Sequence, residues 1–385
     1  MTPAARVAAA IGVLDDCLAG MPVEKALLLW SRGSRYAGSK DRAAVRDHVF
    51  DGWRRRRSAA HASGAQTGRG IMIGLLREDG ADLDLVFTGQ GHAPAALSSA
   101  EKAAPADPPP AAVAHDLPDW LWQRFEADLG PRAGPAALAL RRRAPVYLRV
   151  NPRRADAATA IEALAQEGIA AAAHETVEGA LRVISGERAL SRSRAFTDGL
   201  VELQDASSQA AMLRLPLRDG QSVLDYCAGG GGKALALAGR AEVAVTAHDI
   251  SAARMRDIPA RAARAGVRIE LAEDPGAARY DHVLVDAPCS GSGTWRRDPD
   301  GKWRLTPEAL RDLAQLQARL LDEALAHVAP GGSLSYATCS VLHEENDAIV
   351  TGFLERHPHW RLCDRMQRWP DEAGDGFFLA RFEQG

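Results

Sequence analysis

The sequence predicts an α/β protein in which an all-helical N-terminal domain and a small α+β segment precede a doubly wound, mainly parallel sheet. From about residue 218, short apolar stretches such as "QSVLDYC" and "DHVLVDAP" alternate with helix-like stretches, and this alternation is typical of parallel sheets. Before residue 92, apolar residues recur instead at spacings of three and four, as in amphipathic helices. These two patterns predict the fold class.

Changes in composition divide the chain into four segments. The helical pattern ends near residue 92, and the next stretch is rich in Ala and Pro and holds three consecutive prolines, which cannot lie inside a helix. After it, the strand-like "PVYLRVN" and "ALRVIS" flank the helix-like "DAATAIEALAQEGI". We therefore expect a helical domain at 1–92, a linker at 93–117, an α+β segment at 118–215 and the sheet domain at 216–385.

Composition excludes several classes of protein. No apolar run in the 385 residues approaches the roughly 18 that a membrane helix needs. The five cysteines form no CxxC pair, so neither a disulfide framework nor a zinc site is indicated, and a reducing cytoplasm is favoured. Residues 1–150 carry 20 Lys and Arg against 16 Asp and Glu, whereas the remainder carries 27 against 34. That basic excess is compatible with a polyanion partner but is too small to indicate one.

Four consecutive glycines, Gly229–Gly232, connect the first strand of the predicted sheet domain to a helix. Glycine lets the backbone approach a ligand closely, and a helix N-terminus offers unpaired N–H groups, so the loop indicates a cofactor site. A phosphate-binding P-loop is excluded, because it needs glycine where Cys227 stands and Ser or Thr where Ala234 stands.

Two cofactors remain compatible with this loop. Gly229, Gly231 and Ala234 keep a weak dinucleotide fingerprint, with Asp249 about 20 residues further on. S-adenosylmethionine fits as well, because Asp225 could hydrogen-bond its amino group and Asp249 its ribose hydroxyls. Both acids could instead cap turns or helices. The loop alone leaves these alternatives open.

Two cysteines end two further predicted strands. Cys289 follows "DHVLVDAP", and Cys339 ends a strand that begins after Pro330-Gly331-Gly332. Since the carboxyl ends of parallel strands share one edge of a sheet, we expect both thiols to converge beside the glycine loop. A free cysteine is usually a small buried hydrophobic residue, but two cysteines at the ends of strands favour a catalytic role. C5-methylation of a pyrimidine needs such a nucleophile, because a thiolate that adds to C6 makes C5 carbanion-like.

The chain resembles the Sun-type RNA cytosine-C5 methyltransferases at these loops. The resemblance rests on "DYCAGGGGK", "DAPCSG" and "ATCS", and it extends over nearly the whole chain. "KDRAAVRDHVFDGWRRR" is similar to the NusB-like RNA-binding domain of the family's bacterial small-subunit ribosomal RNA branch. The resemblance implies a Rossmann-like methyltransferase sheet, S-adenosylmethionine as cofactor and small-subunit (16S) ribosomal RNA as partner. A monomer is the default expectation, and the cysteine content favours a cytoplasmic location.

The resemblance also implies roles for individual residues. Cys339 matches the thiolate that attacks C6, Cys289 the thiol that assists product release, and Asp286 an acid that bonds the cofactor or the target cytosine. The residues implied to bind the cofactor are Asp225, Cys227, Ala228, Gly229, Gly230, Gly231, Gly232, Lys233, Asp249 and Asp286, with Asp274 as the candidate for the adenine side. The family's usual Ala-Ala-Pro-Gly-Gly-Lys lacks its stiff proline here.

Chemistry alone leaves open which thiol attacks. DNA cytosine-C5 methyltransferases use the cysteine of a Pro-Cys pair, which would select Cys289. The family resemblance selects Cys339, and we follow it.

The loop "TWRRDPDGKWRLTP" after Cys289 interleaves tryptophans with cations. Because aromatic rings can stack on an unpaired base and cations can contact phosphate, we expect this loop to bind RNA. The residues expected to do so are Arg296, Arg297, Lys302 and Trp303. The alternative is a solvated loop with buried tryptophans. "HEEN", residues 343–346, suggests a catalytic base, although acidic residues in the first turn of a helix explain it more simply.

Overall fold

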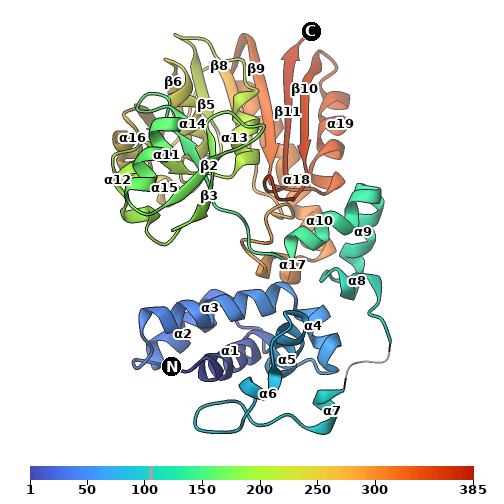
Figure 1. Cartoon of the computed structure of the whole chain (residues 1–385). Coiled ribbons are helices and arrows are strands. Elements are labelled where there is room, and N and C mark those ends of the chain that lie inside the picture. The colour runs from blue at the N-terminus through green and yellow to red at the C-terminus, as the bar shows by residue number, and fades with distance from the viewer. Residues whose placement is uncertain (104–106) are drawn as a thin grey trace. The chain divides into compact units, whose positions relative to one another are not determined.

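The computed structural model describes residues 1–103 and 107–385, which form two compact units (Figure 1). One unit comprises residues 1–143 together with 295–304, and the other comprises 144–294 and 305–385. Residues 104–106 of the predicted linker lie outside the described residues. Within the described part of the chain, no helix combines the length and the apolar character needed to span a bilayer.

The first unit is all-helical, as predicted. Its α-helices are α1 (Pro3–Leu18), α2 (Val23–Gly33), α3 (Ser39–Arg54), α4 (Arg56–Ser63), α5 (Gly68–Glu78), α6 (Leu83–Val86), α7 (Ser99–Lys102), α8 (Ala111–Ala114), α9 (Asp119–Leu129), α10 (Ala133–Leu140) and α17 (Asp300–Arg304), and a 3-10 turn η1 spans Gly130–Arg132. The predicted boundary at residue 118 differs from the structure, because α9 and α10 belong to this unit.

The core of the helical unit forms where α1, α3, α4 and α5 pack together. Leu14, Val49, Ile71 and Met72 are fully buried there, as the periodicity of the sequence requires. Helices α4 and α5 approach so closely that a Cβ on Gly74 would lie 1.8 Å from the carbonyl oxygen of Ala59. Glycine is therefore required at that crossing.

Residues 295–304 pack into the helical unit, although they follow Cys289 in the sequence. Trp295 is 1% exposed and stacks on Phe125 at 6.0 Å between ring centroids. The Asp300 carboxylate accepts hydrogen bonds from the Trp53 indole at 2.7 Å and from the Val23 backbone N–H, which begins α2, at 3.0 Å. The segment is thus an integral part of the helical core.

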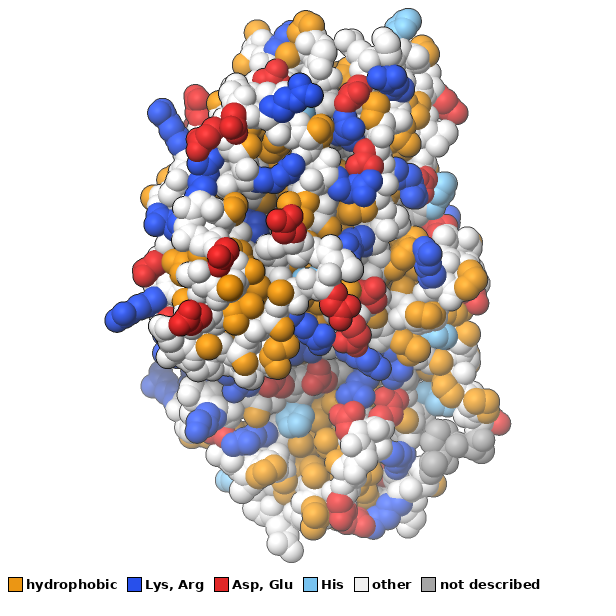
Figure 2. Space-filling view, turned by 45° about the horizontal axis from the view of Figure 1, so that its top comes forward, with side chains coloured by type: hydrophobic (Ala, Val, Ile, Leu, Met, Phe, Trp, Pro, Cys, Tyr) orange, Lys and Arg blue, Asp and Glu red, His pale blue; other side chains and the backbone are white. Residues whose placement is uncertain are grey.

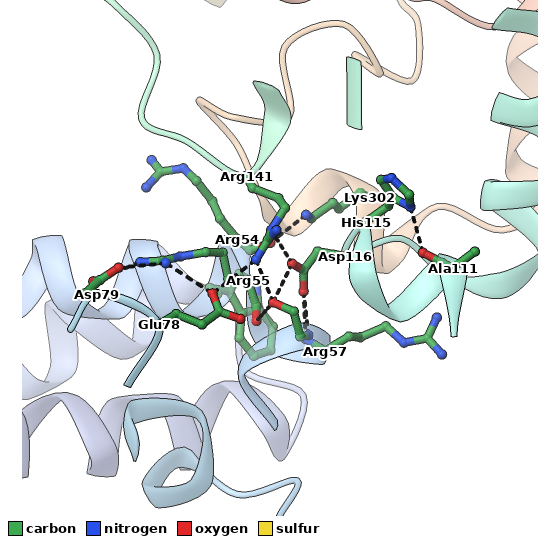
Figure 3. Close-up of polar contacts among 12 residues, drawn as sticks. Arg54, Arg55, Arg57, Glu78, Asp79, Ala111, His115, Asp116, Arg141 and Lys302 are labelled. Atoms are coloured by element: carbon green, nitrogen blue, oxygen red, sulfur yellow. Dashed lines mark hydrogen bonds and ion pairs between the residues drawn. The ribbon is translucent and has the colours of Figure 1, made fainter. Parts of the chain in front are cut away.

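A polar cluster lies beside this segment (Figure 3). The Asp116 carboxylate, fully buried, accepts hydrogen bonds from the backbone N–H groups of Arg57 and Ser58, both at 2.9 Å, and lies 2.7 Å from the Arg141 guanidinium. Its backbone has a positive φ of 54°, which a residue other than glycine adopts only where surrounding contacts hold it. The Lys302 ammonium donates to the Arg54 carbonyl at 2.7 Å.

Replacing Lys302 by methionine is expected to change how stability depends on pH. Burial lowers the pKa of Lys302 from its ordinary 10.5 to about 7. Between those two values the unfolded chain binds more protons than the folded one, so this residue's contribution to stability rises with pH. We expect the difference in the free energy of unfolding between the native protein and Lys302→Met to shift by about 2 kcal/mol in favour of the native protein when the pH rises from 7 to 9.

Urea unfolding at pH 7, 8 and 9 measures this difference. Lys102→Met, which removes a half-exposed lysine on α7, is the matched control and should give a difference that does not vary with pH. If the free energy of unfolding changed equally with pH in the native protein and in Lys302→Met, the Lys302 ammonium would not be desolvated.

The second unit contains two sheets. Its strands are β1 (Tyr147–Val150), β2 (Ala170–Ala173), β3 (Ala180–Ser185), β4 (Val201–Leu203), β5 (Ser222–Asp225), β6 (Ala244–His248), β7 (Ile269–Ala272), β8 (Tyr280–Asp286), β9 (Val328–Thr338), β10 (Trp360–Arg368) and β11 (Phe377–Gln384). Its α-helices are α11 (Ala157–Gln166), α12 (Arg194–Thr197), α13 (Ala206–Leu213), α14 (Gly232–Arg240), α15 (Ala252–Met255), α16 (Ile258–Ala265), α18 (Pro307–Ala324) and α19 (Asp347–Arg356), with 3-10 turns η2 (Leu190–Arg192), η3 (Leu325–His327) and η4 (His343–Glu345).

The smaller sheet confirms the predicted α+β segment. Its strands lie in the order β2-β3-β1-β4, all antiparallel, and α11 packs against it. The four alanines of β2 are strong helix formers, yet they pair with β3, so tertiary contacts override local propensity here.

The larger sheet is the predicted doubly wound one, with strands in the order β10-β11-β9-β8-β5-β6-β7. Strands β9, β8, β5, β6 and β7 run parallel, and β11 and β10 are added antiparallel at one edge. Alternate residues enter opposite layers: Leu224 packs with α18 and α19, whereas Val223 packs with α13 and α14. The carboxyl ends of the parallel strands consequently share one edge, where ligands bind in such sheets.

Candidate functional site

The glycine loop leaves β5 at that edge and enters α14. Gly229 and Gly231 have positive φ values of 51° and 77°, and a Cβ on Gly231 would lie 2.7 Å from Ile258 Cγ1. Only glycine meets both conditions at position 231 without strain. The loop therefore brings the N-terminus of α14 to the edge of the sheet, while the N–H groups of Gly229 and Gly231 are bonded within the protein, to Asp249 and to the Ala228 carbonyl.

Asp225, the last residue of β5, is 1% exposed. One carboxylate oxygen accepts a hydrogen bond from the Ala234 N–H at 3.1 Å, whereas Oδ1 is buried and has no hydrogen-bond partner among the described residues. Burial, and secondarily the neighbouring Asp286, raises the pKa of Asp225 to about 7. An unpaired buried oxygen is costly, so this atom is suited to a ligand that donates a hydrogen bond.

Asp249, after β6, holds the loop in shape. Its carboxylate accepts hydrogen bonds from the N–H groups of Gly229 and Ser251, both at 2.9 Å, and pairs with Arg254 at 3.1 Å. Contact with a ribose stays a prediction for this residue. Asp274, after β7, is exposed and accepts a hydrogen bond from the Gly276 N–H at 2.8 Å, so the structure places it in a turn at the same edge.

Lys233 and Asp286 form an ion pair with Nζ and Oδ2 2.5 Å apart. Burial alone would lower the pKa of Lys233, but the Asp286 carboxylate outweighs it and the pKa is raised. Lys233 therefore stays a cation at the centre of the site, near Cys339.

Cys289 and Cys339 converge as predicted, with their sulfur atoms 3.4 Å apart. Both side chains are partly buried and neither forms a disulfide. The hydrogen bond between the two thiols raises the pKa of Cys289 and lowers that of Cys339. Burial and Asp286 oppose the lowering at Cys339, whereas the Lys233 cation adds to it, so ionisation of the pair is favoured at Cys339.

Glu345 is a residue of this site that the sequence-based interpretation set aside. It lies in η4, is fully buried, and accepts hydrogen bonds from the backbone N–H and the hydroxyl of Ser290, from the hydroxyl of Ser340 and from the Gln317 amide. Glu345 does lie in the first turn of η4, as the simpler explanation states, but its carboxylate also bonds the residues that follow the two cysteines. The available signal was its position six residues after Cys339.

The expected RNA contact of the loop after Cys289 needs correction. Arg296 and Lys302 are 2% and 1% exposed, and the Trp303 indole donates to the Trp53 carbonyl at 3.0 Å. Arg296 and Lys302 are therefore not available to RNA phosphates, and Trp295 is buried as the alternative interpretation expected. Trp303 is partly buried, and its RNA contact stays a prediction. Arg297 is exposed, and its RNA contact stays a prediction.

The distribution of charge on the surface indicates a polyanion partner no more strongly than the charge balance of the sequence does. Figure 2 shows lysine and arginine side chains interspersed with acidic ones on the face it displays. Many of the cations are paired, as Arg55 is with Asp79 at 2.9 Å and Arg365 with Asp347 at 2.6 Å. Local arrangement, rather than net charge, must carry any specificity for a polyanion.

Comparison with known proteins agrees with this architecture. Residues 212–383 match the family model described as 16S rRNA methyltransferase RsmB/F, and residues 117–188 match the ferredoxin-like domain of RsmF/B-like methyltransferases. Ribosomal RNA small subunit methyltransferase B of Erwinia tasmaniensis is 35% identical over 286 residues, which cover 69% of this chain and 65% of that protein. The chain therefore matches about two thirds of the length of such curated relatives.

Two solved structures share the fold. The crystal structure of PH0851 has a TM-score of 0.76 at 22% identity, covering 100% of this chain and 99% of that one. A methyltransferase homolog protein from Pyrococcus horikoshii has a TM-score of 0.63 at 24% identity, covering 71% of this chain and 97% of that one.

Proposed function

We propose that this chain, which belongs to the RsmB/F methyltransferase family through residues 117–188 and 212–383, transfers a methyl group from S-adenosylmethionine to C5 of a cytosine in small-subunit ribosomal RNA. The observation that carries the proposal is the thiol pair, Cys289 and Cys339, 3.4 Å apart beside a glycine loop. The curated relatives methylate small-subunit ribosomal RNA according to their names, which supports the choice of substrate.

The chain's own residues account for the reaction. The Cys339 thiolate adds to C6 of the cytosine, and the bond it forms pushes electrons onto C5, which takes the methyl group. Transfer of the C5 proton to a base, such as a water molecule, and departure of the thiolate then restore the ring. Lys233 stabilises the Cys339 thiolate, and the protonated Cys289 assists collapse of the adduct and release of the product.

The residues present fit the proposed cofactor. S-adenosylmethionine supplies its methyl group from a sulfonium centre and carries an ammonium group. The buried Oδ1 of Asp225, which has no hydrogen-bond partner among the described residues, is suited to accept from that ammonium. The glycines at 229–232 present no side chain to a cofactor that lies beside the loop. Cys227 keeps its proton, because burial raises its pKa, so it is suited to line the site rather than to react.

The target base must leave its stack before Cys339 can reach C6. We therefore propose that the substrate is an exposed or flipped cytosine. The helical unit, with its NusB-like sequence, would contribute affinity for the RNA while the thiol pair supplies the chemistry.

Two other functions are compatible with parts of the sequence. A dinucleotide dehydrogenase could use the glycine loop, but it has no need of paired thiols, and it would bind NADH rather than S-adenosylhomocysteine. An RNA-binding assembly factor without turnover would bind ribosomal RNA and transfer no labelled methyl group.

Bisulfite mapping of 16S ribosomal RNA tests the proposal. A cytosine that resists conversion in normal cells is expected to be fully converted in cells that lack the gene. The native gene should restore resistance, and Cys339→Ala should not. An unchanged map after deletion would refute cytosine-C5 methylation of this RNA.

A further inference from the structure

The backbone of the glycine loop is held by side chains that lie outside it. Four consecutive glycines place little restriction of their own on the chain, and the proline that the family usually has at position 230 is absent. Arg261, on α16, donates a hydrogen bond to the carbonyl of Gly230. Arg149, on β1, donates to the carbonyl of Gly232 at 3.0 Å. Two carbonyl groups of the loop are therefore bound by arginines.

Glu202, on β4 of the smaller sheet, keeps Arg261 in this position. Its carboxylate lies 3.4 Å from the Arg261 guanidinium and 2.7 Å from that of Arg264, three residues further along α16. Because Glu202 is only 8% exposed, water competes little for these charged contacts. Arg261 thus connects the smaller sheet to the glycine loop, whereas Arg264 binds the same carboxylate on a side chain that bonds Glu202 rather than the loop.

The Arg261 guanidinium occupies the space beside Gly230 that a side chain at that position would take. The Gly231 N–H donates to the Ala228 carbonyl at 2.8 Å, which closes a turn with Gly229 and Gly230 at its centre. A Cβ on Gly230 would lie 3.2 Å from Nη1 of Arg261. Gly230 is not among the glycines with a positive φ, so its backbone conformation is open to residues that carry a side chain. The restraint on this turn therefore comes from Arg261 instead of from residue 230 itself.

We propose that Arg261 is a positioning residue for the cofactor, which fixes the glycine loop through the Gly230 carbonyl before the cofactor binds. A loop that is already ordered loses less conformational entropy on binding than four unrestrained glycines would lose, and that loss is subtracted from the affinity. The hold of Arg261 thus takes the place of the absent proline. Its effect on affinity rests on the proposed binding of S-adenosylmethionine at this loop, whereas the hold itself is a property of the protein alone.

Hydrogen–deuterium exchange of the full-length protein without cofactor tests the hold on the loop. Arg261→Met removes the donors but keeps the apolar stem of the side chain. Exchange of the Gly229 and Gly231 N–H groups should become about tenfold faster than in the native protein, because the loop opens more easily. Arg264→Met is the matched control: it removes an arginine from the same helix and the same carboxylate, and it should leave exchange in the loop unchanged. Equal loop exchange in Arg261→Met and the native protein would overturn the proposal.

Titration calorimetry with S-adenosylhomocysteine measures the effect on the cofactor. The Kd should rise about tenfold in Arg261→Met and stay within about twofold of the native value in Arg264→Met. Adding Gly230→Ala to Arg261→Met should recover about two- to fivefold in affinity, because alanine restricts the backbone and Nη1 of Arg261 no longer crowds its Cβ. A merely structural role of Arg261 in α16 would not be restored by a stiffer loop. An affinity of Arg261→Met equal to that of the native protein would contradict the inference.

Arg261→Lys keeps the test decisive if Arg261→Met does not fold. A single ammonium cannot replace the guanidinium fork that reaches both Gly230 and Glu202, so exchange in the loop should still rise, by at least about threefold. Exchange equal to that of the native protein would again overturn the proposal. If the native protein bound no S-adenosylhomocysteine, the proposed cofactor would be refuted while the exchange results would stand, so the two failures are distinguishable.

Discussion

Cys339→Ala is expected to abolish both methyl transfer and covalent attachment to RNA, whereas Cys289→Ala is expected to keep the attachment and lose turnover. Cys339 is the member of the pair whose pKa is lowered, by the Cys289 hydrogen bond and by Lys233, so it supplies the thiolate that adds to C6. Removing a nucleophile typically costs at least about a thousandfold in rate. Without Cys289, the adduct forms but collapses slowly.

The covalent adduct can be detected directly. Small-subunit ribosomal RNA containing 5-fluorocytidine retains the adduct, because the fluorine at C5 cannot leave as a proton does. A complex stable to denaturing electrophoresis is expected for the native protein and for Cys289→Ala, and none for Cys339→Ala. Cys363→Ala, which changes an exposed thiol on β10, is the matched control and should behave as the native protein. Attachment by Cys339→Ala, with none by Cys289→Ala, would reverse the two roles.

Asp225→Asn is expected to weaken cofactor binding by one to two orders of magnitude at pH 8, since a hydrogen bond to a charged group contributes about 1.5–3 kcal/mol. The native protein should also show a pH dependence that this variant lacks. Burial raises the pKa of Asp225 to about 7, so below that value the carboxyl is protonated and cannot pair with an ammonium. Affinity should then fall about tenfold for each pH unit below 7 and level off above it.

Titration calorimetry with S-adenosylhomocysteine between pH 5.5 and pH 8.5 measures this dependence. Asp312→Asn, a change of an exposed acid on α18, should bind as the native protein does at every pH. A native affinity that stays constant across this range would contradict the assignment of Asp225 to the ammonium group.

The fold class and the parts of the site were predictable because their signals are local. A run of glycines after an apolar stretch specifies a tight loop between a strand and a helix, and the structure confirms that Gly231 accepts no other residue there. The convergence of Cys289 and Cys339 was also predictable, since parallel strands bring their carboxyl ends to one edge. The structure brings the two sulfur atoms to 3.4 Å from each other.

Whether the loop after Cys289 contacts RNA or packs in the protein core was not predictable from local signals. Its alternation of tryptophans and cations is equally suited to stacking on bases and to packing in a protein core. The structure selects the core: Lys302 bonds Arg54, and Asp300 bonds Trp53 and Val23, all of which lie more than 240 residues away in the sequence. No spacing rule relates such distant partners.

The sequence by itself determined the chemistry available at the edge of the sheet: two thiols, a lysine, four carboxylates and a glycine loop, each placed by the strand it follows. Only the tertiary structure decided which of these side chains are charged and which are already bonded to other parts of the protein. Glu345 became part of the site through Ser290, 55 residues distant, and Arg296 and Lys302 were buried in the helical unit. The reason is physical, because ionisation and availability depend on burial and on the nearest opposite charge, and both are set by neighbours that folding brings together.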